Sequence, residues 1–382
     1  MDRTGAEAPV FTFSEKLFSS ILRFRELERC LFLPNSLQLW GEGVKCIMPI
    51  KKFNHIPLAV LDLAPINEGS ETAQAFKNSV NLAQYVEKLG FNRFWLAEHH
   101  NMPGIGSSAT SVLIGHIAGH TESIRVGSGG VMLPNHAPLV IAEQFGTLET
   151  IYPGRIDLGL GRAPGSDQGT AYALRRTLGS TGDEFPQLVA ELENYFSPNP
   201  AGRVRAYPGT DLKIPLWLLG SSGFSAQLAA QKGLPFSFAS HFAPDYMMQA
   251  LQLYHQNFKP SKALDKPYAM LGVNIIAADT QERAEWLATS QQQQMFSLMR
   301  GEPTTFRAPI DDIEEVWTPR EIAIYREKMD SESTIVGTPD VVREKLTAFI
   351  NKTRADEIIV NSQIFHHEDR LRSYEIVADM MD

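Results

Sequence analysis

From residue 57 to the end of the chain, short apolar runs alternate with stretches whose apolar residues recur at helical spacing. One helical stretch covers residues 72–89, where Phe76, Val80, Ala83 and Val86 share a face and Gly90 follows as a cap. Repeated strand–helix units predict a parallel sheet covered by helices, and eight units favour a closed barrel over an open sheet. We therefore predict an α/β fold, a single (β/α)8 TIM barrel, with strands at residues 58–63, 93–98, 124–133, 155–160, 215–219, 235–239, 268–278 and 356–361.

Two segments do not follow this alternation. Residues 1–47 contain a possible helix at 14–29 but no strand that ends in glycine. Met48 precedes the first regular structure, so we predict the barrel domain at 48–382. Residues 1–47 are then an N-terminal extension, either outside the functional start or packed on the domain as an arm. Residues 300–333 form an insertion with a small helix near 320–328, which is either a lid over the barrel mouth or an ordinary surface excursion.

Charge and cysteine content exclude several classes of partner. The 382 residues carry a net charge of -9 and show no basic cluster, so neither nucleic acid nor an anionic membrane is an expected partner. Two cysteines, Cys30 and Cys46, are too few for a disulfide framework. Charged residues interrupt the first stretch of the chain, which argues against a signal peptide. We expect a cytoplasmic protein.

Histidines and glycines gather where the second and third predicted strands end, and in a βα barrel such ends face the mouth. Glu98, His99 and His100 follow the second strand, where a histidine can move protons near neutral pH or simply bond to a loop carbonyl. We expect no metal, because adjacent residues on an extended backbone point apart. The glycines at 127, 129 and 130 indicate a flat ligand against the third strand, or else a bulge or a tight barrel corner.

A phosphate site is predicted after the fourth and fifth strands. Arg162 lies beyond an apolar strand end, where a fixed cation can hold phosphate. Small residues then open a helix after the fifth strand, and free N–H groups at a helix N-terminus favour an anion. An ordinary helix cap is the alternative for that segment alone. Candidates for lining the pocket nearby are Ala64, His100 and His241.

Four stretches resemble the bacterial luciferase-like flavin monooxygenase superfamily, most closely its alkanal monooxygenase-like branch. They are AEHHNMPGIGSSA (97–109), VGSGGVMLPNHAPLVIAEQ (126–144), RIDLGLGRAPG (155–165) and LLGSSGFSAQ (218–227). The resemblance implies that His99 is catalytic and that the flavin ring rests near a cis peptide at Gly129–Gly130. It also implies FMN-phosphate binding by Arg162. The full set of implied cofactor residues is Ser128, Gly129, Gly130, Arg162, Ser221, Ser222, Gly223 and Phe224. Gly161 stands where the luciferase light subunit has a reactive cysteine, which argues against light emission.

The resemblance further implies an FMN-dependent two-component monooxygenase. A flavin reductase would supply reduced FMN, and the enzyme would act on paired donors with incorporation of molecular oxygen into a small organic substrate. His99 would be its general acid or base. Three alternatives stay open: a deazaflavin-dependent hydride-transfer oxidoreductase, a non-catalytic flavin-binding protein, and more weakly a phosphate-sugar barrel enzyme without flavin. The resemblance also allows a homodimer.

Overall fold

The structure is a computed structural model that describes residues 49–163, 167–175, 182–314, 316–329 and 331–382. Eight parallel strands close into a barrel in the order β2-β10-β8-β7-β6-β5-β4-β3, and β3 pairs back with β2. The TIM-barrel prediction is confirmed, and every predicted barrel strand lies within two residues of the observed one. The barrel strands are β2 (Ile56–Asp62), β3 (Arg93–Leu96), β4 (Arg125–Met132), β5 (Ile156–Gly161), β6 (Leu216–Gly220), β7 (Phe236–Phe238), β8 (Ala269–Ala277) and β10 (Glu357–Asn361).

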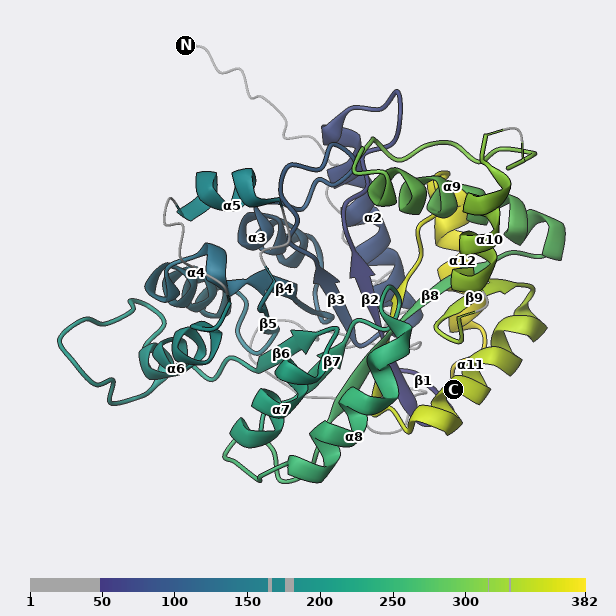
Figure 1. Cartoon of the computed structure of the whole chain (residues 1–382). Helices are drawn as coiled ribbons and strands as arrows, with labels where there is room; N and C mark the ends of the chain where they lie inside the picture. The colour runs from purple at the N-terminus through teal and green to yellow at the C-terminus, as the bar shows by residue number, and fades with distance from the viewer. Residues whose placement is uncertain (1–48, 164–166, 176–181, 315, 330) are drawn as a thin grey trace, which may run out of the picture. The chain divides into compact units, whose positions relative to one another are not determined.

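Helices surround the strands, as Figure 1 shows. The helix predicted at 72–89 is observed with those bounds, and Gly90 ends it in the left-handed conformation at φ 91. The described helices are α2 (Thr72–Leu89), α3 (Thr110–His120), α4 (Pro138–Ile151), α5 (Gln168–Arg175), α6 (Phe185–Phe196), α7 (Gly223–Lys232), α8 (Met247–Asn257), α9 (Gln281–Met299), α10 (Pro319–Met329), α11 (Pro339–Thr353) and α12 (His367–Ala378). Two 3-10 turns, Leu133–Asn135 and Pro244–Tyr246, precede α4 and α8.

The hydrophobic core has two layers. The larger one fills the space between the strands and the helices. A smaller cluster joins Ala59 and Leu61 of β2 to Trp95 of β3, Trp217 of β6 and Ile359 of β10. Because these strands are spread around the barrel, this cluster is the barrel interior. Side chains alternate along a strand, so positions two residues from these members also face inward.

Three elements were not predicted. Strand β1 (Lys52–Phe53) pairs antiparallel with β2. Strand β9 (Thr334–Gly337) pairs in parallel with the C-terminal half of β8. The third is α5, a helix of eight residues after β5. Each is short, and an element of two to eight residues carries little periodicity.

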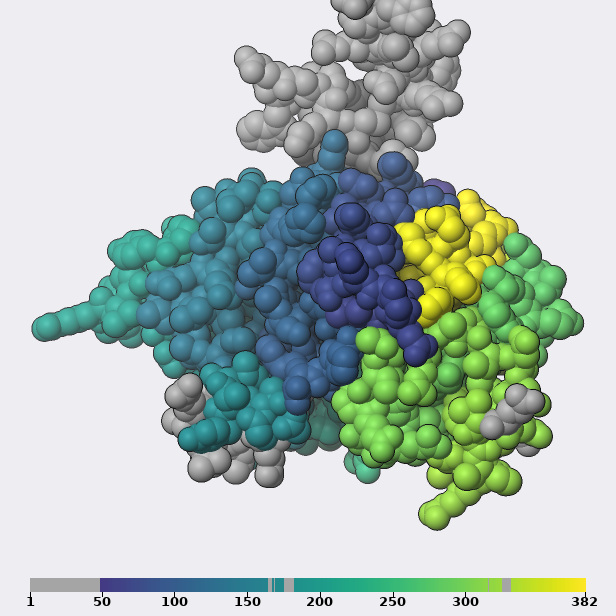
Figure 2. Space-filling view, turned by 90° about the horizontal axis from the view of Figure 1, so that it is seen from above, coloured from purple at the N-terminus to yellow at the C-terminus, as the bar shows by residue number. Residues whose placement is uncertain are grey.

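The insertion follows α9 and lies against the loop after β2, and β10 alone separates β2 from β8 in the barrel. The small helix expected near 320–328 is observed as α10. Phe306 donates its N–H to Ile66 and accepts from Glu68, so this segment pairs with the loop after β2. In Figure 2 the green stretch near residue 306 lies against the dark-blue loop near residue 67. The insertion therefore spans from β8 to β2 at the end of the barrel where the strands terminate.

The glutamine run Gln291–Gln294 lies in α9. A run of polar side chains on a helix is typical of a solvated face, but Gln292 and Gln293 are buried. Gln293 donates through Nε2 to the backbone oxygen of Ala308 at 2.7 Å. The insertion covers this face of α9, and Gln293 bonds to its backbone instead of to water.

The predicted helix at 14–29 and the proposed start at Met48 lie outside the described residues. Within the described residues, no helix combines the length and apolarity needed to cross a membrane.

Candidate active site

The side chains of Glu98 and His99, just after β3, point to opposite sides of the extended backbone. Trp95 and Ala97 belong to the cluster inside the barrel, so the two-residue period of the strand directs His99 to the interior as well. Glu98 is buried at 1% exposure and lies on the other side, where it meets the segment that follows β4. The predicted histidine pair is therefore divided between two environments.

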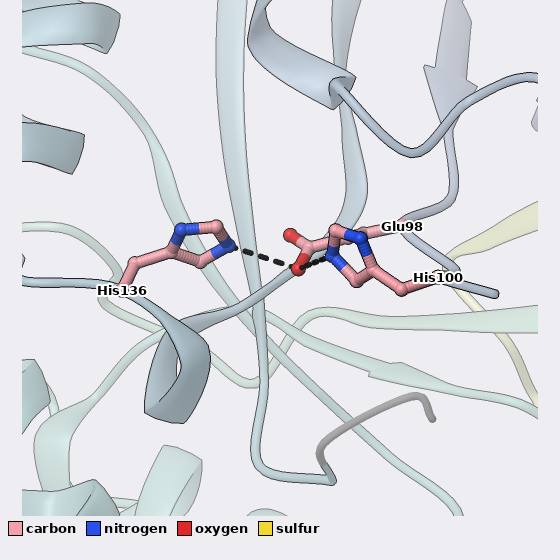
Figure 3. A group of neighbouring side chains, drawn as sticks. All are labelled: Glu98, His100 and His136. Carbon is pink, nitrogen blue, oxygen red and sulfur yellow. Dashed lines mark hydrogen bonds and ion pairs between the residues drawn. The ribbon is translucent and has the colours of Figure 1, made fainter. Parts of the chain in front are cut away.

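Glu98 is the centre of a hydrogen-bonded group. Figure 3 shows the rings of His100 and His136 approaching the same carboxylate oxygen. Each Nε2 lies 2.9 Å from Oε1, and the backbone N–H of Met132 donates to Oε2 at 3.0 Å. Burial alone would raise the pKa of Glu98, but the bonds from His136, His100 and Met132 prevail and hold that pKa below its usual value. Glu98 thus ties the end of β3 to the loop after β4.

The same three side chains have the composition of a metal site. Glu98, His100 and His136 each offer one ligand atom, and these atoms lie within 4.8 Å of one another. We expected no metal from the way adjacent histidines diverge, and that argument did not consider His136. The signal for His136 in the sequence was a histidine four residues past the end of β4, in the loop that faces Glu98. In the structure these atoms form the hydrogen bonds between the two imidazoles and the Glu98 carboxylate.

The third predicted cluster, at β4, combines a bulge with a cis peptide. The bond Gly129–Gly130 is cis, as the resemblance implied. The register with β5 shifts between Ser128 and Val131, which is the irregularity that a bulge produces. A Cβ on Gly130 would lie 2.9 Å from the backbone oxygen of Gly159, which leaves glycine as the fitting residue. The Ser128 hydroxyl bonds to the backbone of Gly159 in both directions, so only the Ser128 backbone is left to meet a cofactor.

The predicted phosphate site is assembled at the ends of β5 and β6. The guanidinium of Arg162 lies 4.4 Å from the centroid of the Phe224 ring, in the first turn of α7. Ser222 is the N-cap of α7, and its side chain makes no capping hydrogen bond. Ser221, Ser222 and Gly223 hence present hydroxyl and backbone N–H groups beside a cation. The structure brings together the two halves of the site that the sequence placed on neighbouring strands.

His241 follows β7 at the same end of the barrel. Its backbone oxygen accepts from Nδ2 of Asn274 on β8 at 2.7 Å. Burial, with a smaller contribution from His99, lowers the pKa of His241 to about 4. His99 and His241, from opposite halves of the chain, are therefore electrostatic neighbours. Asn274 was not predicted, although a polar residue inside the otherwise apolar run of β8 was a visible signal.

The two other pocket candidates lie on the rim. Ala64 is buried just after β2, with a left-handed backbone at φ 48, and its oxygen accepts from the N–H of Gly106. His100 lines an open recess of about 560 Å³ together with Asn101 and residues 167–174 of the α5 region. Asn101 donates to Asp167 across this recess at 3.1 Å. His100 thus belongs to the rim, and His99 to the interior.

A family model described as luciferase-like monooxygenase matches residues 56–357. The chain belongs to the luciferase-like monooxygenase family. A luciferase-like monooxygenase of Escherichia coli (strain K12) is 56% identical over 330 residues, covering 86% of this chain and 97% of the relative. The N-acetyl-S-alkylcysteine monooxygenase of Bacillus subtilis (strain 168) is 31% identical over 334 residues, covering 85% and 98%.

Solved structures agree with the luciferase-like fold. Apo-MsnO8 is similar with a TM-score of 0.76 and 32% identity, over 85% of this chain and 98% of that chain. The oxygenating constituent of 3,6-diketocamphane monooxygenase of Pseudomonas putida, solved in complex with FMN, has a TM-score of 0.65. An F420-dependent secondary alcohol dehydrogenase has a TM-score of 0.59. The FMN complex covers 85% of this chain and 97% of its own, and the dehydrogenase covers 86% and 99%. Each is 15% identical to this chain, so these two structures show the fold alone.

Proposed function

We propose that this luciferase-like protein is an FMN-dependent two-component monooxygenase that uses reduced FMN and O2 to oxidise a small organic substrate. The observation that supports it most is the pairing of Arg162 with Phe224 at the uncapped N-terminus of α7. A fixed cation beside free N–H groups suits a phosphate monoester such as that of FMN. The cis peptide at Gly129–Gly130 lies within β4, and His99 follows the neighbouring strand β3.

The chain's own residues would bind, orient and shield. Arg162, Ser221, Ser222 and the first N–H groups of α7 would hold the phosphate. Reduced FMN supplies the reaction with O2, which amino acid side chains do not provide. His99 would donate or accept a proton within the barrel mouth. The insertion that spans from β8 to β2 would limit the access of water.

The remaining parts of the proposal concern partners and location. We propose a separate flavin reductase as the source of reduced FMN, and paired donors as the reaction class. Thioethers of the N-acetyl-S-alkylcysteine type are the first substrates to test, because a relative that matches 85% of the chain carries that activity in its name.

Exposed Val112 on α3 and Val140 and Ile151 on α4 support a homodimer through these helices. The cysteine content supports a cytoplasmic location.

A deazaflavin-dependent hydride transferase is the second candidate. The barrel is shared with an F420-dependent alcohol dehydrogenase, so the fold accommodates either cofactor. A deazaflavin also carries a phosphate, and Arg162 would serve both. Preference for reduced deazaflavin over reduced FMN would favour this candidate, and tight FMN binding without oxygen-dependent turnover would favour a non-catalytic flavin protein.

The decisive experiment is an anaerobic titration with reduced FMN and reduced deazaflavin, followed by mixing with O2 and candidate thioethers. We expect reduced FMN to bind tightly and Arg162→Ala to raise its Kd by about 10- to 100-fold, the size of one charge-assisted contact. Arg283→Ala is the matched control. Arg283 also lies 4.4 Å from an aromatic centroid, that of Trp286, but on α9. Equal affinity in both variants, or no binding of reduced FMN, would overturn the proposal.

A further inference from the structure

The backbone at His241 is fixed by hydrogen bonds from two sides. Ser240 donates through Oγ to the backbone oxygen of Gly272 on β8 at 2.6 Å. Asn274, two residues further along β8, donates to the backbone oxygen of His241. Ser333, just before β9, donates to the backbone oxygen of Ser240 at 2.7 Å. The end of β7 is thus held against β8 and the insertion, and the position of the imidazole is set by the fold.

The His241 ring occupies the space that Gly272 leaves free. A Cβ on Gly272 would lie 2.2 Å from Nδ1 of His241, so any larger residue there would displace the ring. Gly272 faces the interior, because Met270 two residues earlier belongs to the interior cluster. The imidazole therefore lies over the barrel interior. His99 is near it there, and the charge of His99 contributes to the lowered pKa of His241.

The two ring nitrogens of His241 have different surroundings. Nδ1 is buried and has no hydrogen-bond partner among the described residues. Nε2 is not among the buried unpartnered atoms and forms no hydrogen bond to the described chain, so it keeps access to solvent at the mouth. An orphaned buried N–H is rarer and more costly than a lone pair in the same place. The single proton of a neutral imidazole then belongs on Nε2.

We propose that His241 is a substrate-binding residue that presents a neutral Nε2–H donor, beside His99, to an acceptor oxygen of the bound substrate. A low pKa agrees with this, since the ring is neutral at pH 7 and retains one donor. The substrate class that fits is a small organic molecule that carries a carbonyl or carboxylate oxygen. This inference rests on the proposed monooxygenase function for the identity of the ligand, but the state of the ring is independent of it.

The tautomer is measured by NMR on protein labelled with 15N-histidine, without FMN and at pH 7. The His241 signals are assigned by their loss in His241→Gln, with His255→Gln on the exposed face of α8 as the control. We expect a neutral ring protonated on Nε2. In Gly272→Ala the ring must move, and the His241 signals should shift while those of His255 stay. A ring that is charged at pH 7, or protonated on Nδ1, would overturn the inference whether or not the protein is a monooxygenase.

The binding role is measured by steady-state kinetics with a substrate that supports turnover, N-acetyl-S-methylcysteine being the first probe. His241→Phe removes the donor and should raise KM about tenfold with a smaller effect on kcat, whereas His241→Gln keeps a donor and should restore most of the affinity. Gly272→Ala should raise KM similarly and add little to His241→Phe. Unchanged KM in His241→Phe would contradict the inference. Absence of turnover in the wild type would contradict the proposed function instead, and the NMR result would stand.

Discussion

Glu98 joins two strand ends through a single carboxylate. Replacing it with Gln removes the charge and places an amide N–H2 before two donating imidazoles. We expect Glu98→Gln to lower the free energy of unfolding at pH 7 by about 1–3 kcal/mol, as for other buried hydrogen-bonded charges. The measurement is urea denaturation of the wild type and the variant.

The same substitution has a defined pH dependence. Because the pKa of Glu98 is lowered in the folded state from its ordinary value of 4.5, the folded protein binds this proton more weakly than the unfolded chain. The stabilisation is therefore present above about pH 4.5 and lost as the pH falls through the lower, folded pKa. The difference in the free energy of unfolding between the wild type and Glu98→Gln should become smaller below about pH 4.5. Glu344→Gln, on the exposed face of α11, should show no gap, and a pH-independent gap would contradict the role of the charge.

Single residues were predictable from sequence to the extent that local geometry places them. The direction of His99 follows from the two-residue period of β3, and Arg162 from its position beyond β5. The position of His136 depends on the path of the loop after β4. The Gly272–His241 contact depends on the pairing of β7 with β8, whose partners Ser237–Met270 and Phe238–Leu271 are 33 residues apart in the chain. Non-local contacts of this kind leave no periodic trace in the sequence.

At the scale of elements, α9 and the insertion behave as one unit. Gln293 donates to Ala308, and Thr289 accepts from the N–H of Ile310 at 2.9 Å. Gln293→Ala removes the first bond, and we expect amide hydrogen exchange over residues 304–312 to accelerate about fivefold, the effect of one net hydrogen bond. The barrel strands should exchange as before. Glu285→Ala, on the exposed face of the same helix, is the control, and equal exchange in both variants would contradict this anchoring.

Element prediction succeeded where repeats are long and failed where burial is created by another segment. Helix α2 has five turns of amphipathic pattern and was predicted with its bounds. The glutamine run has a polar composition that indicates solvent exposure, and only the insertion lying over it makes Gln292 and Gln293 buried. Strand β9 has four residues, and its signal was lost beside the polar insertion.

At the scale of the whole molecule, buried charges link strands of the barrel to one another. Arg93 of β3 bonds to Asp157 of β5 at 2.6 Å and to Glu357 of β10 at 3.0 Å, and both carboxylates are fully buried. Arg93 thus joins strands on either side of the point where the sheet closes. The eight-unit repeat predicted that closure would occur, but not which side chains neutralise one another across the interior.

Arg93→Met tests this network. It would leave two buried carboxylates short of a cation, and we expect a loss of about 3–5 kcal/mol in the free energy of unfolding, measured by urea denaturation.

Burial already raises the pKa of Glu357 against the opposing effect of Arg93, so removing Arg93 would raise that pKa further. The folded variant would then bind the proton more tightly than the unfolded chain, and its deficit should grow as the pH rises from 5 to 8. Arg93→Met/Glu357→Gln should recover part of the loss, whereas Arg343→Met on the exposed face of α11 should cost little. A deficit below about 1 kcal/mol, or one that shrinks with rising pH, would show that the barrel does not depend on this ion pair for closure.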